Sequence, residues 1–229
     1  MPAEAWYQRA PDRWNAQLEG VRRRHPFLRG EERDGVAVIV GDLQIEHDGK
    51  VLGSFEIEID VPFDGPETAM PVVREVGGRI PREPARHIDD DRGTACLEAP
   101  VSYWWKHPEG LNLREFIDGP VRAYFYGQCV VEATGTWPDT GEWPHGAEGL
   151  EAAYRELLGL SGSALVRCLL KLARHGKIPR QWRCPCGSGK RSSRCHGGTL
   201  NELAKRVPKA QLEKDICVIH EWLEKENRK

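Results

Sequence analysis

The chain has 229 residues, of which 39% are hydrophobic and 30% charged, which is enough apolar material for one large domain or for a medium domain and a small one. No stretch approaches the ~18–20 consecutive apolar residues of a membrane helix, and residues 1–6 lack the basic and apolar regions of a signal peptide. The sequence therefore argues against a membrane protein and against secretion, and predicts a cytoplasmic protein.

The formal net charge of −2 conceals two segments of opposite sign. Residues 1–149 contain 16 Lys and Arg against 27 Asp and Glu, whereas residues 150–229 contain 17 against 8. This asymmetry predicts two modules, and the basic module is expected to bind an acidic partner such as nucleic acid or another protein. The alternative is that the two halves face each other.

The first 80 residues predict one helix followed by an antiparallel meander. Apolar residues at helical spacing predict a helix over 4–24, which Pro11 shortens and Pro26 ends. Alternation of apolar and polar residues then predicts three strands, at 36–45, 51–61 and 70–76. Asp48-Gly49 predicts a tight hairpin turn between the first two of these strands.

The remainder of the chain predicts a long loop and then helices. Residues 81–110 contain four prolines and little periodicity, which predicts a loop of the kind that carries function. Helical patterns follow at 111–128, with a second piece beginning at Pro120, at 150–176 as one helix or a pair, and at 200–229; residues 135–149 read as a loop. We therefore expect an α+β fold with domains at 1–149, 150–181 (a helical linker), 182–198 (a zinc motif) and 199–229 (a helical tail).

Four side chains in the basic tail have the spacing of a zinc site. Cys184 and Cys186 lie on a tight Gly-containing turn, and Cys195 and His196 follow about nine residues later. Zn²⁺ takes four such ligands in a tetrahedron, and nearby Lys and Arg side chains would offset the charge of three thiolates. A closed set of four ligands predicts structural zinc. The alternative is four free side chains in a basic loop.

The same run, Cys184-Pro-Cys186-Gly-Ser-Gly-Lys and then Cys195-His196, resembles the SEC-C motif. That motif is a small zinc-binding tail found at the end of the bacterial secretion ATPase and of many unrelated proteins. The resemblance covers about twenty residues. It implies that the four residues are the zinc ligands and that the tail docks a protein or nucleic acid.

The predicted loop at 81–110 holds the sequence Gly93-Thr-Ala-Cys96-Leu97, with Trp104 eight residues after the cysteine. A lone cysteine is usually a small buried hydrophobic residue. In this context, however, residues 4–149 resemble the ubiquitin-conjugating (UBC) enzymes, in which a helix and a meander precede a loop with H-P-N, G-x-x-C-L and a Trp. The divergence points to the bacterial relatives of that family, which are often encoded in phage-defence operons.

The resemblance implies that Cys96 accepts the C-terminus of a ubiquitin-like protein from an activating enzyme as a thioester and passes it to an amine. The chain departs from the family because Arg86-His87-Ile88 stands where H-P-N is expected, so the family's Asn is missing. His87 is our candidate proton carrier or donor, with Arg86 as an alternative donor. His87 also reads as a loop residue that fixes the backbone by hydrogen bonding.

Other candidates have a functional and a structural reading. Asp89–Asp91 read as a solvated turn or as an acidic group that acts on the acceptor lysine, and His145 reads as a turn residue or as a neighbour of Cys96. Cys129, Cys168 and Cys217 are expected in the core, and Trp104 and Trp105 are expected to anchor the loop.

Two other functions compete with a conjugating enzyme. The first is a non-catalytic UBC-fold adaptor, which the missing Asn favours and Cys96 disfavours. The second is a nucleic-acid-binding protein led by the basic tail, for which the tail offers few aromatic residues.

Overall fold

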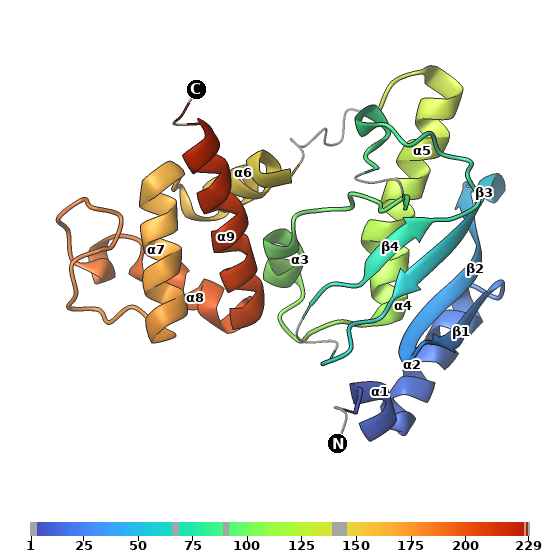
Figure 1. Ribbon diagram of the computed structural model, residues 1–229, viewed down its shortest axis with the longest axis horizontal. Coiled ribbons are helices and arrows are strands. Elements are labelled where there is room, and N and C mark those ends of the chain that lie inside the picture. The colour runs from blue at the N-terminus through green and yellow to red at the C-terminus, as the bar shows by residue number, and fades with distance from the viewer. Residues whose placement is uncertain (1–3, 66–68, 89–91, 139–145, 227, 229) are drawn as a thin grey trace. The chain divides into compact units, whose positions relative to one another are not determined.

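A computed structural model describes the chain except for residues 1–3, 66–68, 89–91, 139–145, 227 and 229 (Figure 1). Contacts divide the chain into two compact units. The first comprises residues 1–97 and 111–142, and the second comprises residues 98–110 and 143–229. Residues 98–110 therefore belong to the second unit, whereas the sequence-based division had assigned them to the first.

The first unit is built on a four-stranded antiparallel sheet, so the α+β class is confirmed. Its strands follow one another in space as they do in the chain: β1 (Leu28–Arg33), β2 (Val36–His47), β3 (Lys50–Asp60) and β4 (Val72–Glu75). The turn at Asp48-Gly49 is confirmed, because both residues have positive φ and His47 pairs with Lys50 across it.

The strand β1 was not predicted, because its sequence LRGEER has no apolar alternation. It pairs with β2 through a second tight turn, Asp34-Gly35, in which both residues also have positive φ. On the strand, Arg33 forms ion pairs with Glu31 and with Glu58 of β3. The Asp-Gly dipeptide was the local signal that could have revealed this hairpin.

The core of the first unit lies between one face of the sheet and the helix α5 (Arg122–Thr134). Phe55, Ile57 and Ile59 alternate along β3 and are at most 1% exposed, and the ring of Phe55 lies 4.8 Å from that of Phe125 on α5. Burying each such side chain contributes roughly 1.5–3 kcal/mol relative to leaving it exposed. This packing fixes the sheet and so fixes the edge strand β4.

Prolines divide the predicted helices of the first unit. The N-terminal helix is broken at Ala10 into α1 (Trp6–Arg9) and α2 (Pro11–Arg24), with Pro11 as the first residue of α2. The helix predicted from 111 begins as α4 (Leu113–Phe116), passes through a π-helical turn, η2 (Ile117–Val121), and continues as α5. Gly119 is non-helical there, so the predicted new start at Pro120 is confirmed.

The second unit is helical (Figure 1). Its elements are α3 (Pro100–Lys106), α6 (Gly146–Leu158), α7 (Gly162–His175), the short η3 (Ser192–Arg194), α8 (Gly197–Arg206) and α9 (Lys209–Glu226). The expected helix or pair at 150–176 is a pair. The prediction of a loop throughout 81–110 was wrong at α3, where Pro100 occupies the first helical turn and Val101, Tyr103 and Trp104 are buried.

A buried polar cluster links α6 to α9 in the second unit. Asp215 is 2% exposed and accepts hydrogen bonds from the Tyr154 hydroxyl (2.8 Å) and from the Gln211 amide (2.7 Å). Burial raises the pKa of Asp215 to about 6. In the part of the chain that the structure describes, no helix has the length and apolarity needed to cross a membrane.

Candidate functional site

The four predicted metal ligands converge in the second unit. One ligand atom from each of Cys184, Cys186, Cys195 and His196 lies within 4.8 Å of the others. The Cys186 and Cys195 sulfurs are 3.6 Å apart, and His196 Nδ1 lies 3.6 Å from the Cys184 sulfur and 3.2 Å from the Cys195 sulfur. Three sulfurs and one imidazole nitrogen that surround a common point can hold a metal ion.

The first pair of cysteines is set by a tight loop. The Cys184 N–H donates to the Lys190 carbonyl (2.8 Å), which closes the loop, and Gly187 and Gly189 have φ of +91° and +74°. Residues other than glycine rarely adopt such angles. The Ser188 N–H points at the Cys186 sulfur at 3.4 Å, so the backbone already supplies a donor to this ligand.

The second pair lies at the junction of η3 and α8. The Cys195 N–H donates to the Ser192 carbonyl (3.0 Å), and the buried Ser192 hydroxyl donates to the Pro179 carbonyl (2.6 Å). A Cβ on Gly197 would lie 2.7 Å from the Ser192 carbonyl oxygen, so only glycine fits beside His196. This close packing brings Cys195 and His196 back toward the first pair.

Two side chains outside the metal-ligand loop hold that loop and the segment that leads into it. Arg167 of α7 donates to the carbonyls of Pro185 (3.4 Å) and Cys186 (3.3 Å). Asn201 of α8 makes two hydrogen bonds to the backbone of Ile178, accepting from its N–H (2.7 Å) and donating to its carbonyl (3.0 Å). The sequence analysis did not identify either residue, because neither lies in the motif.

The local electrostatics differ between the two cysteines of the first pair. Burial raises the pKa of Cys184. Partial burial acts in the same direction on Cys186, but hydrogen bonds from Ser188, Cys184 and Cys195 together outweigh it and lower the pKa of that thiol to about 6. A metal ion binds thiolates, so Cys186 is already prepared as a ligand.

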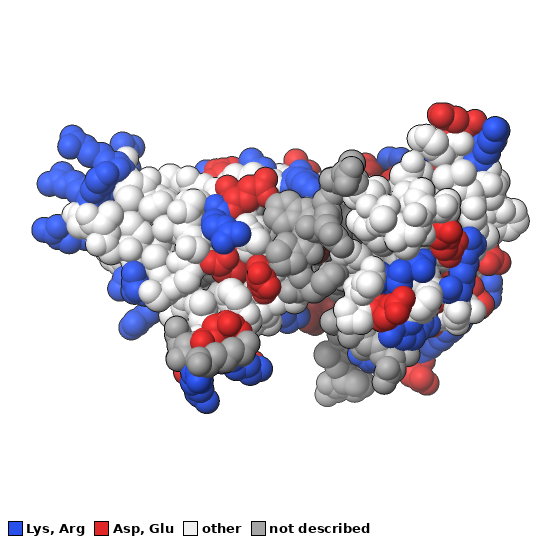
Figure 2. All heavy atoms as spheres, turned by 90° about the horizontal axis from the view of Figure 1, so that it is seen from above, with Lys and Arg blue, Asp and Glu red and all other residues white. Residues whose placement is uncertain are grey.

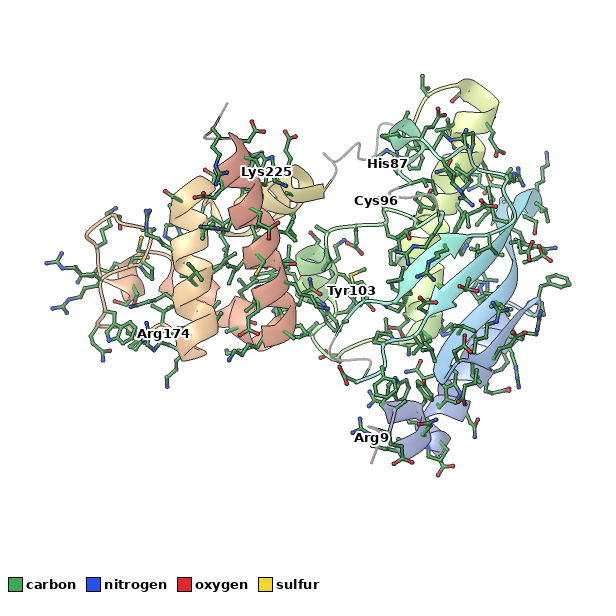
Figure 3. All side chains as sticks on the ribbon, viewed as in Figure 1. Arg9, His87, Cys96, Tyr103, Arg174 and Lys225 are labelled. Atoms are coloured by element: carbon green, nitrogen blue, oxygen red, sulfur yellow. The ribbon has the colours of Figure 1, made fainter. Side chains whose placement is uncertain are left out.

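Cys96 lies in the first unit on a segment that pairs with the outer edge of β4 (Figure 3). The Ala95 N–H donates to the Val73 carbonyl (2.8 Å), and the Glu75 N–H donates to the Gly93 carbonyl (3.0 Å). On its other side, the Cys96 N–H donates to the His87 carbonyl (2.8 Å). Hydrogen bonds thereby fix the backbone of Cys96, and Cys96 is exposed.

An ion pair with a buried carboxylate packs against the segment 93–96. Glu75 is 0% exposed; its carboxylate forms an ion pair with Arg82 (3.1 Å) and accepts the Arg79 N–H (3.0 Å). Arg82 also donates to the Glu75 carbonyl (2.7 Å). Gly93 has φ of +79°, and a Cβ there would collide with both Arg82 and the Glu75 carbonyl. The sequence analysis did not identify Glu75 or Arg82, although Gly93, which packs against both, was part of the motif.

The segment η1 (Pro84–Arg86) and the following His87 are held against α5. The Arg86 carbonyl accepts hydrogen bonds from Tyr124 (3.0 Å) and Gln128 (2.6 Å), and Arg86 Nε donates to Gln128 (2.7 Å). His87 has positive φ (+53°) and is 7% exposed, with its ring 4.3 Å from that of Trp137. Its carbonyl therefore positions Cys96, which agrees with the reading of His87 as a residue that fixes the backbone.

The other sequence candidates are distributed as follows. Asp89–Asp91 and His145 lie outside the described residues. Trp104 is 1% exposed but belongs to the second unit, whereas Cys96 belongs to the first. Cys129 and Cys168 are buried as expected, but the expectation for Cys217 was wrong, because Cys217 is exposed on α9.

Comparisons with known proteins add no assignment. No protein-family model matches the chain. No curated protein and no solved structure shows significant similarity to it. The function is therefore argued from the two groups of residues described above.

Proposed function

We propose that the protein is a conjugating enzyme of the UBC type, which carries a ubiquitin-like protein on Cys96 as a thioester. The observation that carries this proposal is an exposed thiol on a backbone held from both sides, by β4 and by the His87 carbonyl. A fixed, accessible sulfur suits an exchange between two large proteins, because the thiol must reach the incoming carbonyl without local rearrangement.

The chemistry consists of two acyl transfers. The Cys96 thiolate attacks the C-terminal carbonyl of the modifier, the bond to the sulfur of the activating enzyme breaks, and that sulfur leaves as a thiolate. In the second transfer an acceptor amine attacks the same carbonyl, loses a proton, and releases Cys96 as a thiolate. The first exchange is nearly balanced in energy, since one thioester replaces another.

The second transfer needs a proton acceptor and a donor to the oxyanion. His87 and Arg86 are the residues that we assign to these tasks from the sequence. The Arg86 guanidinium is engaged by Gln128, and the His87 ring is packed against Trp137. These contacts favour a second candidate function, a non-catalytic UBC-like adaptor, if neither residue is released during the reaction.

We further propose that the metal held by Cys184, Cys186, Cys195 and His196 is Zn²⁺ in a structural role. Three sulfurs and one imidazole are the ligands that Zn²⁺ prefers, and four protein ligands leave no position open for a substrate. The bound ion would fix the loop against α7 and α8, and so stabilise a tail that docks a partner.

Intact mass spectrometry tests the carrier function. The full chain is co-expressed with a bacterial activating enzyme and the ubiquitin-like protein that this enzyme charges. We expect an adduct that reductant removes from the wild type, an adduct that resists reductant in Cys96→Ser, and no adduct in Cys96→Ala.

Cys217→Ser is the matched control, because Cys217 is the other exposed cysteine outside the metal cluster. It is expected to form the same reductant-sensitive adduct as the wild type. If no variant and no wild-type protein forms an adduct while the activating enzyme charges itself, the carrier function is wrong and the adaptor function replaces it.

A further inference from the structure

Residues 157–201 contain nine Lys and Arg and no Asp or Glu. All nine cationic side chains are exposed: Arg167, Lys171, Arg174, Lys177, Arg180, Arg183, Lys190, Arg191 and Arg194. We call this set the cationic surface. Figure 2 shows Lys and Arg gathered at the end of the second unit that carries the metal-ligand loop.

The cationic surface is continuous across two elements of the second unit. Arg167 of α7 reaches the carbonyls of Pro185 and Cys186 in the loop, and the Lys171 ammonium lies 5.6 Å from the ring centre of Trp182. Along α7, Arg167, Lys171 and Arg174 are spaced three and four residues apart and so share one side of the helix. The helix and the loop therefore present their cations side by side.

The charge of this surface is not neutralised within the described residues. None of the nine side chains forms an ion pair with a carboxylate there, whereas Arg33, Arg74 and Arg79 of the first unit are all paired with Glu or Asp. The proposed metal centre accounts for little of the surplus. Three thiolates around a divalent ion leave about one net negative charge against nine cations.

The chemistry of the surface favours a phosphate backbone over an acidic protein. A protein interface needs a buried apolar centre with aromatic anchors, but Leu170, at 50% exposure, is the one exposed large apolar side chain within 157–201. Trp182 is part-buried, with Lys171 over its ring and the His175 ring 5.1 Å away, so little of it is open for a base to stack on. A cationic surface without base stacking or base reading makes the kind of contact that proteins make to the phosphate backbone of a duplex.

We propose that the cationic surface binds the phosphate backbone of double-stranded nucleic acid without sequence selection. The partner needs a dense, regular array of negative charge, which a duplex supplies at about one charge per 1.7 Å of its axis. This inference is independent of the function of Cys96, because no residue of the first unit takes part.

Fluorescence anisotropy with the zinc-loaded full chain and labelled 20-base-pair DNA or RNA duplexes tests the proposal. The test variant is the triple Arg174→Gln, Arg180→Gln and Arg194→Gln. The matched control is Arg22→Gln, Lys50→Gln and Lys225→Gln, which removes the same charge from exposed positions elsewhere. Circular dichroism and zinc content verify that both variants are folded.

We expect wild type and control to bind duplexes of unrelated sequence equally, with affinity falling steeply as salt rises. The test variant should bind roughly tenfold more weakly near 100 mM salt, and the slope of log K against log[salt] should fall by about 0.9 per lost phosphate contact. Binding to only the DNA duplex or only the RNA duplex would still support the proposal and would identify which kind of duplex is the partner. Equal losses in both variants, equally tight binding of polyglutamate, or no duplex binding at 50 mM salt would overturn it.

Discussion

The backbone N–H of Cys96 donates a 2.8 Å hydrogen bond to the carbonyl oxygen of His87. His87, which the sequence suggested as a proton carrier, thus fixes the backbone of Cys96 through its own main chain, while its ring packs on Trp137. A substitution at His87 therefore removes the ring while it leaves the carbonyl that accepts from Cys96.

We expect His87→Asn to retain thioester formation at Cys96 within about threefold of the wild type, because Asn tolerates the positive φ of this position and keeps the carbonyl. A proton-carrier role would likewise leave thioester formation intact but would slow transfer to the amine. Single-turnover discharge to free lysine, measured between pH 6.5 and 9, separates the two roles. An unchanged discharge profile would confine His87 to positioning.

Gly93→Ala should destabilise the first unit by about 2–4 kcal/mol, because the new Cβ meets Arg82 and the Glu75 carbonyl at a positive φ. Gly78→Ala is the matched control: its φ is +74°, but a Cβ there meets nothing within 4 Å. The control should lose only about 1–2 kcal/mol from the left-handed backbone. Urea unfolding measures both, and equal losses would show that the packing below Gly93 is unimportant.

Cys195→Ser should abolish stoichiometric metal binding, because one of four ligands is lost and the remaining three leave the site open. Elemental analysis should find about one zinc per chain in the wild type and in Cys217→Ser. A chelator should lower the melting temperature of those two proteins and leave that of Cys195→Ser unchanged. Full zinc content in Cys195→Ser would contradict the assigned ligand set.

Asn201→Ala should weaken metal retention and destabilise the second unit by about 1–3 kcal/mol, since it leaves the Ile178 N–H and carbonyl without their partner. Asn201→Asp keeps the acceptor for the N–H and loses the donor to the carbonyl, so its effect should be intermediate. Competition with a chromogenic chelator measures retention. Wild-type retention in both variants would show that this side chain does not support the loop.

Asp215→Asn should change how the second unit responds to pH. Burial raises the pKa of Asp215 from 3.8 to about 6, so between these values the folded protein holds a proton that the unfolded chain releases. The free energy of unfolding then falls as pH rises through this window, by up to about 3 kcal/mol.

The Asn variant lacks this loss, so relative to wild type it should gain stability between pH 4.5 and pH 7. The Gln211 amide can turn to accept from Asn, and Tyr154 keeps an acceptor. Urea unfolding of both proteins at the two pH values gives the comparison, in which pH effects on the metal site cancel. If the two proteins differed in free energy of unfolding by the same amount at both pH values, titration of Asp215 would not contribute to the pH dependence.

Some elements carried their own signals in the sequence. Alternation along 51–61 predicted β3, and Asp48-Gly49 predicted its turn, because period and turn conformation are local properties. The spacing of Cys184, Cys186, Cys195 and His196 likewise predicted a shared site, since a short glycine-containing loop allows few arrangements other than convergence.

Other features depended on partners distant in the chain. The charged strand β1 exists because β2 pairs with it and because Arg33 finds Glu58 on β3, neither of which its own six residues reveal. The proline-rich segment predicted as a loop contains α3, which packs against α6, α8 and α9 and has Tyr103 and Trp104 buried. Tertiary burial outweighs local composition in both cases.

The sequence by itself determined which residues are candidates for chemistry: Cys96, the cluster of Cys184, Cys186, Cys195 and His196, and the basic residues of 150–229. Only the tertiary structure decided how those residues are held. The Asn201 bonds to Ile178 and the packing of His87 on Trp137 join residues far apart in the chain, and Gly93 meets Arg82 and the Glu75 carbonyl only in the folded unit. The sequence gives the type of each side chain, but a supporting contact forms only where folding brings two distant segments together.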